Sequence, residues 1–560
     1  MKKNFKLGAI GALSLMMLAG CGKKLGEFKA DYFSVNPNPL ELVGDNVPAT
    51  VTANIPAKFF VKNAQVTVTP YLVFDGQEVA SQPYSFQGQD VRGNNPVVYF
   101  DRGGTLTIPV DYQWQPQMIK SNLELAFKVN QGGKTYELPR VQVATGVVAT
   151  ADMVSVGNVT PALAADKFQR IIKEKYAADI MFLINRYNIR KNQLTSEQMV
   201  DLQQNITAAN AAPNKEISEI NIKSYASPDG GLAFNTQLAE NREKVTIDYV
   251  NKNLAKNISF GELTAQFTPE DWEGFKKLVE ASNIQDKALI LSVLTMYNDP
   301  EERERELRYL ASAFDELADV ILPELRYSRI TATVDVIGKS DEEIMAAFKS
   351  NPSSLTVDEI LYCATLTDDN GEKIAIYQQA ATLYPNDYRT FNDLGMVQFI
   401  AGDYSGAKSS FEKAARVNPS APEAQMNLGL LSLQNKDYSA ANQKFGAAAG
   451  VEELDEALGT AYLMQGDNAA AARAFGNART NNAALAQILT KDYAKAKSTL
   501  GAIANPDATT YYLCAVLAAR ENNASGVQSN LSKAVKLDPS MAQRAQNDLE
   551  FSKYNVSNIK

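Results

Sequence analysis

Apolar and polar positions alternate along residues 28–152. The runs QVTVT at 65–69 and TLTIPV at 105–110 place an apolar side chain at every second position. This period is typical of strands with one buried face. Clusters of Gly, Asn and Asp recur at short spacing between such runs. The pattern therefore predicts an all-β sandwich of about seven strands over residues 28–152.

The pattern changes over residues 155–340. DKFQRIIKEKYAADI and TSEQMVDLQQNI have helical spacing, EISEINIKSY alternates like a strand and ends in the loop ASPDGG, and a further helix begins near Asn235. Residues from about 255 to 320 form long amphipathic helical runs, and 326–336 alternates again. Strands interleaved with helices predict an α/β domain with a helical insertion, in which the loops at strand ends carry the site.

From residue 342 to about 550 the chain is Ala-rich, helical in its spacing, and repetitive. One Leu-Gly pair with a following Ala, Phe and Ala recurs at a spacing of 34 residues: Leu394, Gly395, Ala407, Phe411 and Ala414, then Leu428, Gly429, Ala441, Phe445 and Ala448. A third copy starts at Leu458 and Gly459. Such a period predicts stacked helix pairs, because one pair cannot bury its apolar face alone.

The N-terminus carries a basic segment with Lys2, Lys3 and Lys6 and an apolar stretch, 7–18, too short to span a bilayer. Leu18-Ala19-Gly20-Cys21 resembles the lipobox of bacterial lipoproteins. The resemblance implies a signal peptide over 1–20, diacylglycerol and an N-acyl chain on Cys21, and a linker over 21–27. Gly22, in place of Asp, implies the outer membrane. The following Lys-Lys, in place of an acidic tract, favours its periplasmic leaflet.

Composition narrows the possible chemistry. The 560 residues include no histidine, which excludes Ser-His and Cys-His nucleophile systems and His-ligated zinc. The formal net charge of -9 disfavours a nucleic-acid partner. The sequence also has no phosphate-binding P-loop and no CxxC motif. We therefore expect a non-enzymatic protein without a metal or other cofactor; an enzyme acting through two carboxylates stays open, since such pairs leave no local signature.

Residues 180–254 resemble the OmpA-like peptidoglycan-associated domain. The matching positions are 220–227, Gly230, Asn235, Leu238 and Arg242, and the helical insertion resembles that of a related group of lipoproteins with an SPxG loop. The resemblance implies a diaminopimelate site in which Arg242 pairs with a carboxylate. The family's aspartate, fifteen positions earlier, is Ser227 here, so the implied site combines Arg242, Asp229, Ser227 and Asn235. Alternatively, Arg242 forms a structural ion pair.

The 34-residue unit resembles the tetratricopeptide repeat, whose stacked helix pairs form a superhelix with a concave groove. The resemblance implies that the groove is lined by the first helix of each unit, at Asn392, Met396, Asn427, Leu430 and Glu456. An apolar groove with Asn donors suits an extended or helical peptide. In the alternative interpretation, the repeats only brace the other domains.

These expectations combine into one multidomain hypothesis. An all-β sandwich, an OmpA-like α/β domain and an all-α tetratricopeptide superhelix would form a periplasmic scaffold, lipid-anchored at Cys21 and recruiting protein partners during envelope or secretion-complex assembly. The alternative function is a tether that binds peptidoglycan and links the outer membrane to the cell wall. A surface-exposed adhesin is a third hypothesis.

Overall fold

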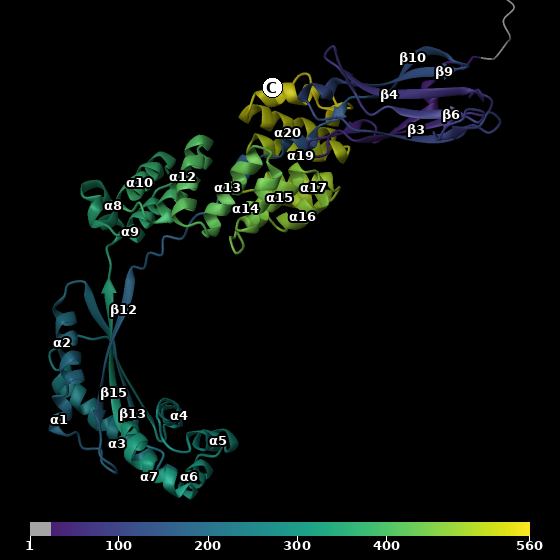
Figure 1. The fold of residues 1–560 in the computed structure, drawn as a ribbon. Coiled ribbons are helices and arrows are strands. Elements are labelled where there is room, and N and C mark those ends of the chain that lie inside the picture. The colour runs from purple at the N-terminus through teal and green to yellow at the C-terminus, as the bar shows by residue number, and fades with distance from the viewer. Residues whose placement is uncertain (1–23, 560) are drawn as a thin grey trace, which may run out of the picture. The chain divides into compact units, whose positions relative to one another are not determined.

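The computed structural model describes residues 24–559, except the side chains of 311–313. The chain divides into two compact units, one comprising the residues up to Ala165 with those from Asp369 onward, and the other comprising Asp166–Asp368. Figure 1 shows the elements of each unit. Among the described residues, no helix combines the length and apolarity needed to cross a membrane. Cys21 and its predicted lipid lie outside this range.

The N-terminal part of the first unit, called here the β-domain (residues 24–149), contains two main sheets. The smaller sheet has the order β1 (Phe33–Asn36), β3 (Ala49–Ile55), β8 (Gly104–Val110). The larger has the order β10 (Lys134–Thr145), β9 (Asn122–Gln131), β4 (Ala64–Phe74), β6 (Tyr84–Gly88), β7 (Val97–Val98), with β5 (Gln77–Ala80) paired to β4. A short parallel pair joins β2 (Leu40–Glu41) to β11 (Val147–Val148).

The two sheets share one core. Val51 and Ile108 of the smaller sheet and Val68 and Phe127 of the larger are each at most 2% exposed and belong to the same apolar cluster. The alternation in the sequence is responsible, since β4 buries every second side chain along its eleven residues. The predicted β-rich N-terminal part is confirmed. It holds eleven strands within residues 33–148, whereas we expected about seven. The two-residue strands were missed because they are too short to show alternation.

The C-terminal part of the first unit is a helical repeat array, called here the array. Its helices are α10 (Asn370–Leu383), α11 (Tyr388–Ile400), α12 (Tyr404–Val417), α13 (Pro422–Gln434), α14 (Tyr438–Gly446), α15 (Leu454–Met464), α16 (Asn468–Phe475), α17 (Asn481–Leu489), α18 (Tyr493–Gly501), α19 (Ala508–Arg520), α20 (Ala524–Leu537) and α21 (Ser540–Asn547). Helices α11 to α20 pack as successive pairs. The predicted helical array is confirmed.

The recurring glycine of each repeat has a steric cause. A Cβ atom added to Gly395, Gly429 or Gly459 would lie 2.6, 2.5 or 2.8 Å from the ring of the phenylalanine sixteen residues later. Only glycine lets the two helices of a pair approach this closely. The Gly and Phe positions of the sequence pattern are therefore one contact within each of these three helix pairs.

The second unit contains one four-stranded sheet with the order β12 (Ile171–Met181), β15 (Tyr327–Ile337), β13 (Lys215–Tyr225), β14 (Glu262–Thr268). β15 runs antiparallel to both neighbours, whereas β13 and β14 are parallel. The helices are α1 (Lys191–Leu194), α2 (Glu197–Ala211), α3 (Leu232–Tyr249), α4 (Trp272–Ala281), α5 (Lys287–Met296), α6 (Pro300–Tyr309), α7 (Ala311–Glu316), α8 (Asp341–Ser350) and α9 (Val357–Cys363).

Two expectations for this unit are wrong. The segment 166–180 was expected to be helical, but β12 begins at Ile171 and pairs with β15 over eleven residues. β12 is an edge strand, and its exposed Lys and Glu side chains imitate a helix surface. The range 255–320 contains strand β14 at Glu262–Thr268, so the helical insertion follows Thr268. The last helical run expected in this range is also interrupted, since α6 ends at Tyr309 and α7 begins at Ala311.

Candidate functional site

Residues 150–165, called here the connector, follow the β-domain and lie against the first helices of the repeats. Two short 3-10 turns, Thr150–Met153 and Val156–Asn158, contact α17 and α13. The connector buries Val156, Val159 and Ala162 in the array's apolar core, where each is at most 3% exposed. The groove expected to receive a peptide from outside therefore holds an extended segment of the same chain.

Two asparagines bind the connector through both polar groups of one backbone residue. Asn427 Oδ1 accepts from the Ala162 amide at 2.7 Å, and its Nδ2 donates to the Ala162 carbonyl at 2.8 Å. Asn482 makes the same pair of bonds with Ser155, at 3.1 and 2.8 Å. A carboxamide can do this because it carries a donor and an acceptor side by side. Both contacts recognise peptide backbone and are independent of the side chain.

The end of the connector meets α11. Asn392 Nδ2 donates to the Ala162 carbonyl at 3.0 Å, and Asp393 Oδ1 accepts from the Ala164 amide at 2.9 Å. Asp393 is 1% exposed, and its burial raises the pKa of this carboxyl to about 8. The side chain is therefore mostly protonated at neutral pH, and the groove holds no uncompensated negative charge at this position.

The groove positions expected from the sequence lie along the connector. Asn392 and Asn427 bond to it, while Met396 and Leu430 belong to the apolar cluster that packs against it. Burial raises the pKa of Glu456, which also interacts with the Thr160 backbone amide. These positions line a peptide-binding surface; their role toward an external ligand stays a prediction.

Sequence reasoning missed Asp393 and Asn482, although the sequence carries a signal for both. Asp393, Asn427 and Asn482 each lie ten residues before an aspartate that caps the second helix of their repeat, namely Asp403, Asp437 and Asp492. Counting back from these caps locates the connector-binding position directly. Counting by 34 residues relates Asp393 to Asn427 but misses Asn482, because the repeats differ in length.

The second candidate site lies at the end of the sheet where β12 and β13 finish. Asn235 Nδ2 donates to the carbonyls of Ser227 (3.2 Å) and Gly230 (2.6 Å), which fixes the loop at the start of α3. Ser227 Oγ donates to Asp229 Oδ1 at 2.5 Å. Three of the four residues expected from the sequence are therefore brought together, with Ser227 and Asp229 in the loop and Asn235 in the first turn of α3.

Arg326 completes this loop cluster and was missed by sequence reasoning. Its Nε donates to Ser227 Oγ at 3.1 Å, and its Nη2 forms an ion pair with Asp229 Oδ2 at 3.0 Å. Arg326 is 8% exposed. Ninety-seven residues separate it from Asp229. Its only local signal is its position directly before the closing strand, β15.

Arg242, the fourth expected residue, is fully buried on α3 and points to backbone. It donates from Nη1 to the Tyr225 carbonyl (2.7 Å), from Nε to Arg186 (3.0 Å) and from Nη2 to Leu183 (3.3 Å). Burial, with a smaller contribution from Arg326, lowers the pKa of the guanidinium to about 10. Within residues 24–559 it forms no ion pair, and its role in binding diaminopimelate stays a prediction.

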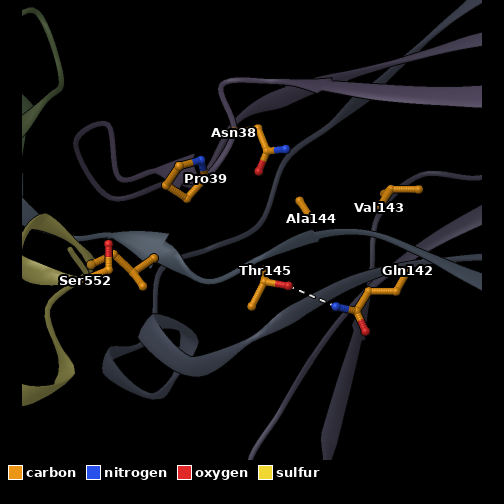
Figure 2. A pocket seen from close by; sticks show the side chains of 8 residues that line it. Asn38, Pro39, Gln142, Val143, Ala144, Thr145 and Ser552 are labelled. Atoms are coloured by element: carbon orange, nitrogen blue, oxygen red, sulfur yellow. Dashed lines mark hydrogen bonds between the residues drawn. The ribbon is translucent and has the colours of Figure 1, made fainter. Parts of the chain in front are cut away.

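One further pocket lies where the β-domain meets the C-terminal end of the array. Figure 2 shows Asn38, Pro39, Thr145 and Ser552 around it, with Gln142 Nε2 donating to Thr145 Oγ1 at 2.9 Å. No ionisable side chain is among the described residues that line this pocket, so they offer no group for acid–base chemistry. In the described part of the chain, no cluster of His, Cys, Asp or Glu is arranged to hold a metal ion.

No protein-family model matches the chain, and no curated protein matches it. Among solved structures, a tetratricopeptide repeat protein from Parabacteroides merdae is 15% identical, covering 37% of this chain and 91% of its own, with a TM-score of 0.29. Pseudomonas aeruginosa pilF is 18% identical over 37% of this chain and 99% of its own, with a TM-score of 0.28. Yeast Tom70 is 12% identical, covering 62% of this chain and 77% of its own, with a TM-score of 0.26.

Proposed function

We propose that this chain is a non-enzymatic scaffold lipoprotein of the bacterial outer membrane, anchored through acyl chains on Cys21 and facing the periplasm. In this proposal the α/β unit is an OmpA-like domain and the array is a tetratricopeptide superhelix. The lipobox-like sequence Leu18-Ala19-Gly20-Cys21 supports the anchor. We further propose that the array recruits protein partners in envelope or secretion-complex assembly.

The observation that carries the proposal is the connection between the β-domain and the array. Asp45 of the β-domain forms an ion pair with Lys436 at 2.5 Å and accepts from the Tyr438 hydroxyl at 2.6 Å. Near the C-terminal end of the array, Thr150 donates to Glu550 at 2.5 Å. With the connector between them, these contacts join both parts into one compact unit. Such a unit can present a partner at a fixed distance from the anchor.

The connector also directs where a partner binds. It covers the inner surface of the repeats from α11 to α17, so we place the partner on a surface that it leaves free. A cleft between α10, α11 and α12 is lined by Gln378, Phe391 and Lys413 among others. An apolar ring beside a cation and amides suits a protein side chain with a carboxylate or carbonyl nearby.

A photo-crosslinking amino acid placed in cells at Thr382, an exposed residue of this cleft, tests the proposal. We expect a defined protein adduct from this position. Asn158, exposed on the connector, is the matched control and should give no such adduct. A result in which Thr382 gives no protein adduct, or gives the same adducts as Asn158, contradicts the recruitment proposal.

The peptidoglycan tether remains a second candidate because the loop cluster joins Ser227, Asp229 and Arg326 at one sheet end. Binding to purified sacculi tests it. The tether predicts that Arg326→Ala, which leaves Asp229 without its ion-pair partner, abolishes binding. Arg329→Ala is the control, since Arg329 lies on the same strand and pairs with Asp179. The scaffold proposal predicts no sacculus binding by either the unchanged chain or these variants.

A further inference from the structure

At the end of the β-domain opposite the array lie several loops and the segment through which the chain enters this domain. β3 and β9 finish there and β4, β8 and β10 begin there, so the segments 56–63, 88–103 and 131–134 lie at this end. Asp45 and Gly146, which contact the array, lie at the other end of the strands. We call the first of these the loop end.

The chain enters the β-domain at the loop end without a long linker. Leu25 is 3% exposed, and its amide donates to Gln131 Oε1 (3.3 Å) and the Tyr136 hydroxyl (3.2 Å). Cys21 precedes Leu25 by four residues, which span at most about 14 Å when fully extended. A lipid on Cys21 would therefore hold the loop end close to the bilayer surface.

The loop end is basic although the protein is acidic. The segments 24–31, 56–63, 88–103 and 131–134 contain seven Lys and Arg and four Asp and Glu, a local formal charge of +3, whereas the whole chain carries -9. The exposed cations are Lys24, Lys29, Lys58, Lys62, Arg92, Arg102 and Lys134. None of them forms a salt bridge within the described part of the chain. These charges are therefore available to an anionic surface.

Three of the cations stand over aromatic rings at this same end. Lys24 lies 5.5 Å from the Tyr136 ring centroid, Lys62 lies 5.8 Å from that of Phe100, and Arg102 lies 3.8 Å from that of Tyr99. Tyr99 is 39% exposed. Aromatic rings combined with basic side chains suit the headgroup region of a membrane, where the ring contacts the apolar boundary and the cation contacts phosphate.

We propose that the loop end docks on the anionic phospholipid headgroups of the membrane that carries the Cys21 lipid. This rests on the proposed lipid anchor for its orientation, while the contact itself is made by Lys62, Arg102, Lys134 and their neighbours. β4 spans about 35 Å at about 3.3 Å per residue. Docking therefore sets the array at roughly that distance from the headgroups, and the β-domain acts as a spacer.

Flotation with vesicles tests the contact separately from the anchor. The mature chain, residues 21–560, is prepared with Cys21→Ser so that it carries no lipid. We expect it to bind vesicles of phosphatidylcholine mixed with phosphatidylglycerol, and to release them as salt is raised. Combined Lys62→Glu, Arg102→Glu and Lys134→Glu should lower the partition coefficient about a hundredfold, at about 1 kcal/mol per cation.

The matched control carries Lys408→Glu, Lys536→Glu and Lys553→Glu, three exposed array positions with the same change in net charge. It should bind like the unchanged chain. The proposal is overturned by absent binding to the anionic vesicles, by equal loss in both variants, or by equal binding to pure phosphatidylcholine. Mass spectrometry of the natural protein tests the anchor: an unmodified Cys21 refutes the anchor in the proposed function and leaves the vesicle result intact.

Discussion

Two of the sites to which the sequence pointed, the groove of the array and Arg242 of the α/β unit, both bind backbone of their own chain. They do so with different chemistry. In the groove, neutral carboxamides donate to and accept from one extended segment. In the α/β unit, a guanidinium that can only donate binds three carbonyls. A side chain suited to peptide recognition thus serves the fold wherever the chain itself supplies the peptide.

Within the α/β unit, Arg242 and the Asp229–Arg326 pair also differ in how much of each side chain is left for a ligand. All three donor-bearing nitrogens of Arg242 are engaged with backbone, and its side chain is fully buried. Asp229 and Arg326 pair with each other, yet the Asp229 side chain is still 16% exposed to solvent and that of Arg326 is 9% exposed. A small charged ligand would therefore meet the Asp229–Arg326 pair before it met Arg242, and it would have to open that pair.

The largest effect that tests this contrast is expected from Arg242→Ala. The substitution leaves the carbonyls of Leu183, Arg186 and Tyr225 without this donor and opens a cavity beside Phe182. We expect the second unit to lose about 3 kcal/mol or more of its free energy of unfolding. Urea denaturation followed by the unit's tyrosine and tryptophan fluorescence measures it.

Arg329→Ala controls for the loss of a guanidinium from this unit. Arg329 is about half exposed and pairs with Asp179, so its removal should cost at most about 1 kcal/mol. If Arg242→Ala proves as mild as this control and instead impairs only the binding of an added peptidoglycan stem peptide, Arg242 belongs to the ligand site and the contrast drawn above is wrong.

The next effect concerns the groove. Asn427→Ala removes both bonds to Ala162 and a third to Asn392. The buried Ala162 amide and the Asn392 side-chain oxygen lose these partners, while the Ala162 carbonyl keeps its bond from Asn392. We expect a loss of about 2 kcal/mol and faster proteolysis within the connector. Asn435→Ala is the control, because this exposed asparagine only donates to the Leu431 carbonyl at the end of its own helix. Equal protease sensitivity of the two variants would show that the connector does not depend on Asn427.

A smaller effect tests whether the groove is framed by rigid helix pairs. Gly429→Ala places a methyl group 2.5 Å from the Phe445 ring, and the overpacking should cost about 1 to 2 kcal/mol. Gly446→Ala, in the next helix, meets no atom within 4 Å and should stabilise the array by a few tenths to about 1 kcal/mol. Thermal unfolding measures the change in stability of each variant. If both variants are stabilised, or both are destabilised, the packing explanation is refuted.

The sequence predicted those parts of the fold in which a pattern of apolar or small residues recurs at a short, regular spacing. Alternation located β4 and β8, and the Gly-Phe spacing located the helix pairs, because each depends on a contact made many times. β12 was mistaken for a helix because an exposed edge strand buries too few side chains to show its period. Arg326 and the connector could not be located by spacing, since their partners lie 97 residues and 224 or more residues away.

The last effect depends on pH and distinguishes the groove from the guanidinium site, because the groove also contains a buried acid. Asp393 has an ordinary pKa of 3.8 when unfolded, and burial raises it to about 8 in the fold. The raised pKa favours the protonated native state, so this group's contribution is fully present below about pH 3.8. It is lost progressively as pH rises to about 8 and stays constant above that value.

Asp393→Asn removes this dependence while keeping an oxygen that can accept from the Ala164 amide. We expect the variant to match the unchanged chain near pH 5 within about 2 kcal/mol and to exceed it by at least about 3 kcal/mol near pH 9. Urea unfolding of the first unit at both values measures the difference. A constant offset between the two proteins across this range would show that Asp393 is already ionised in the fold, and that the groove holds the connector with a carboxylate in place of a neutral side chain.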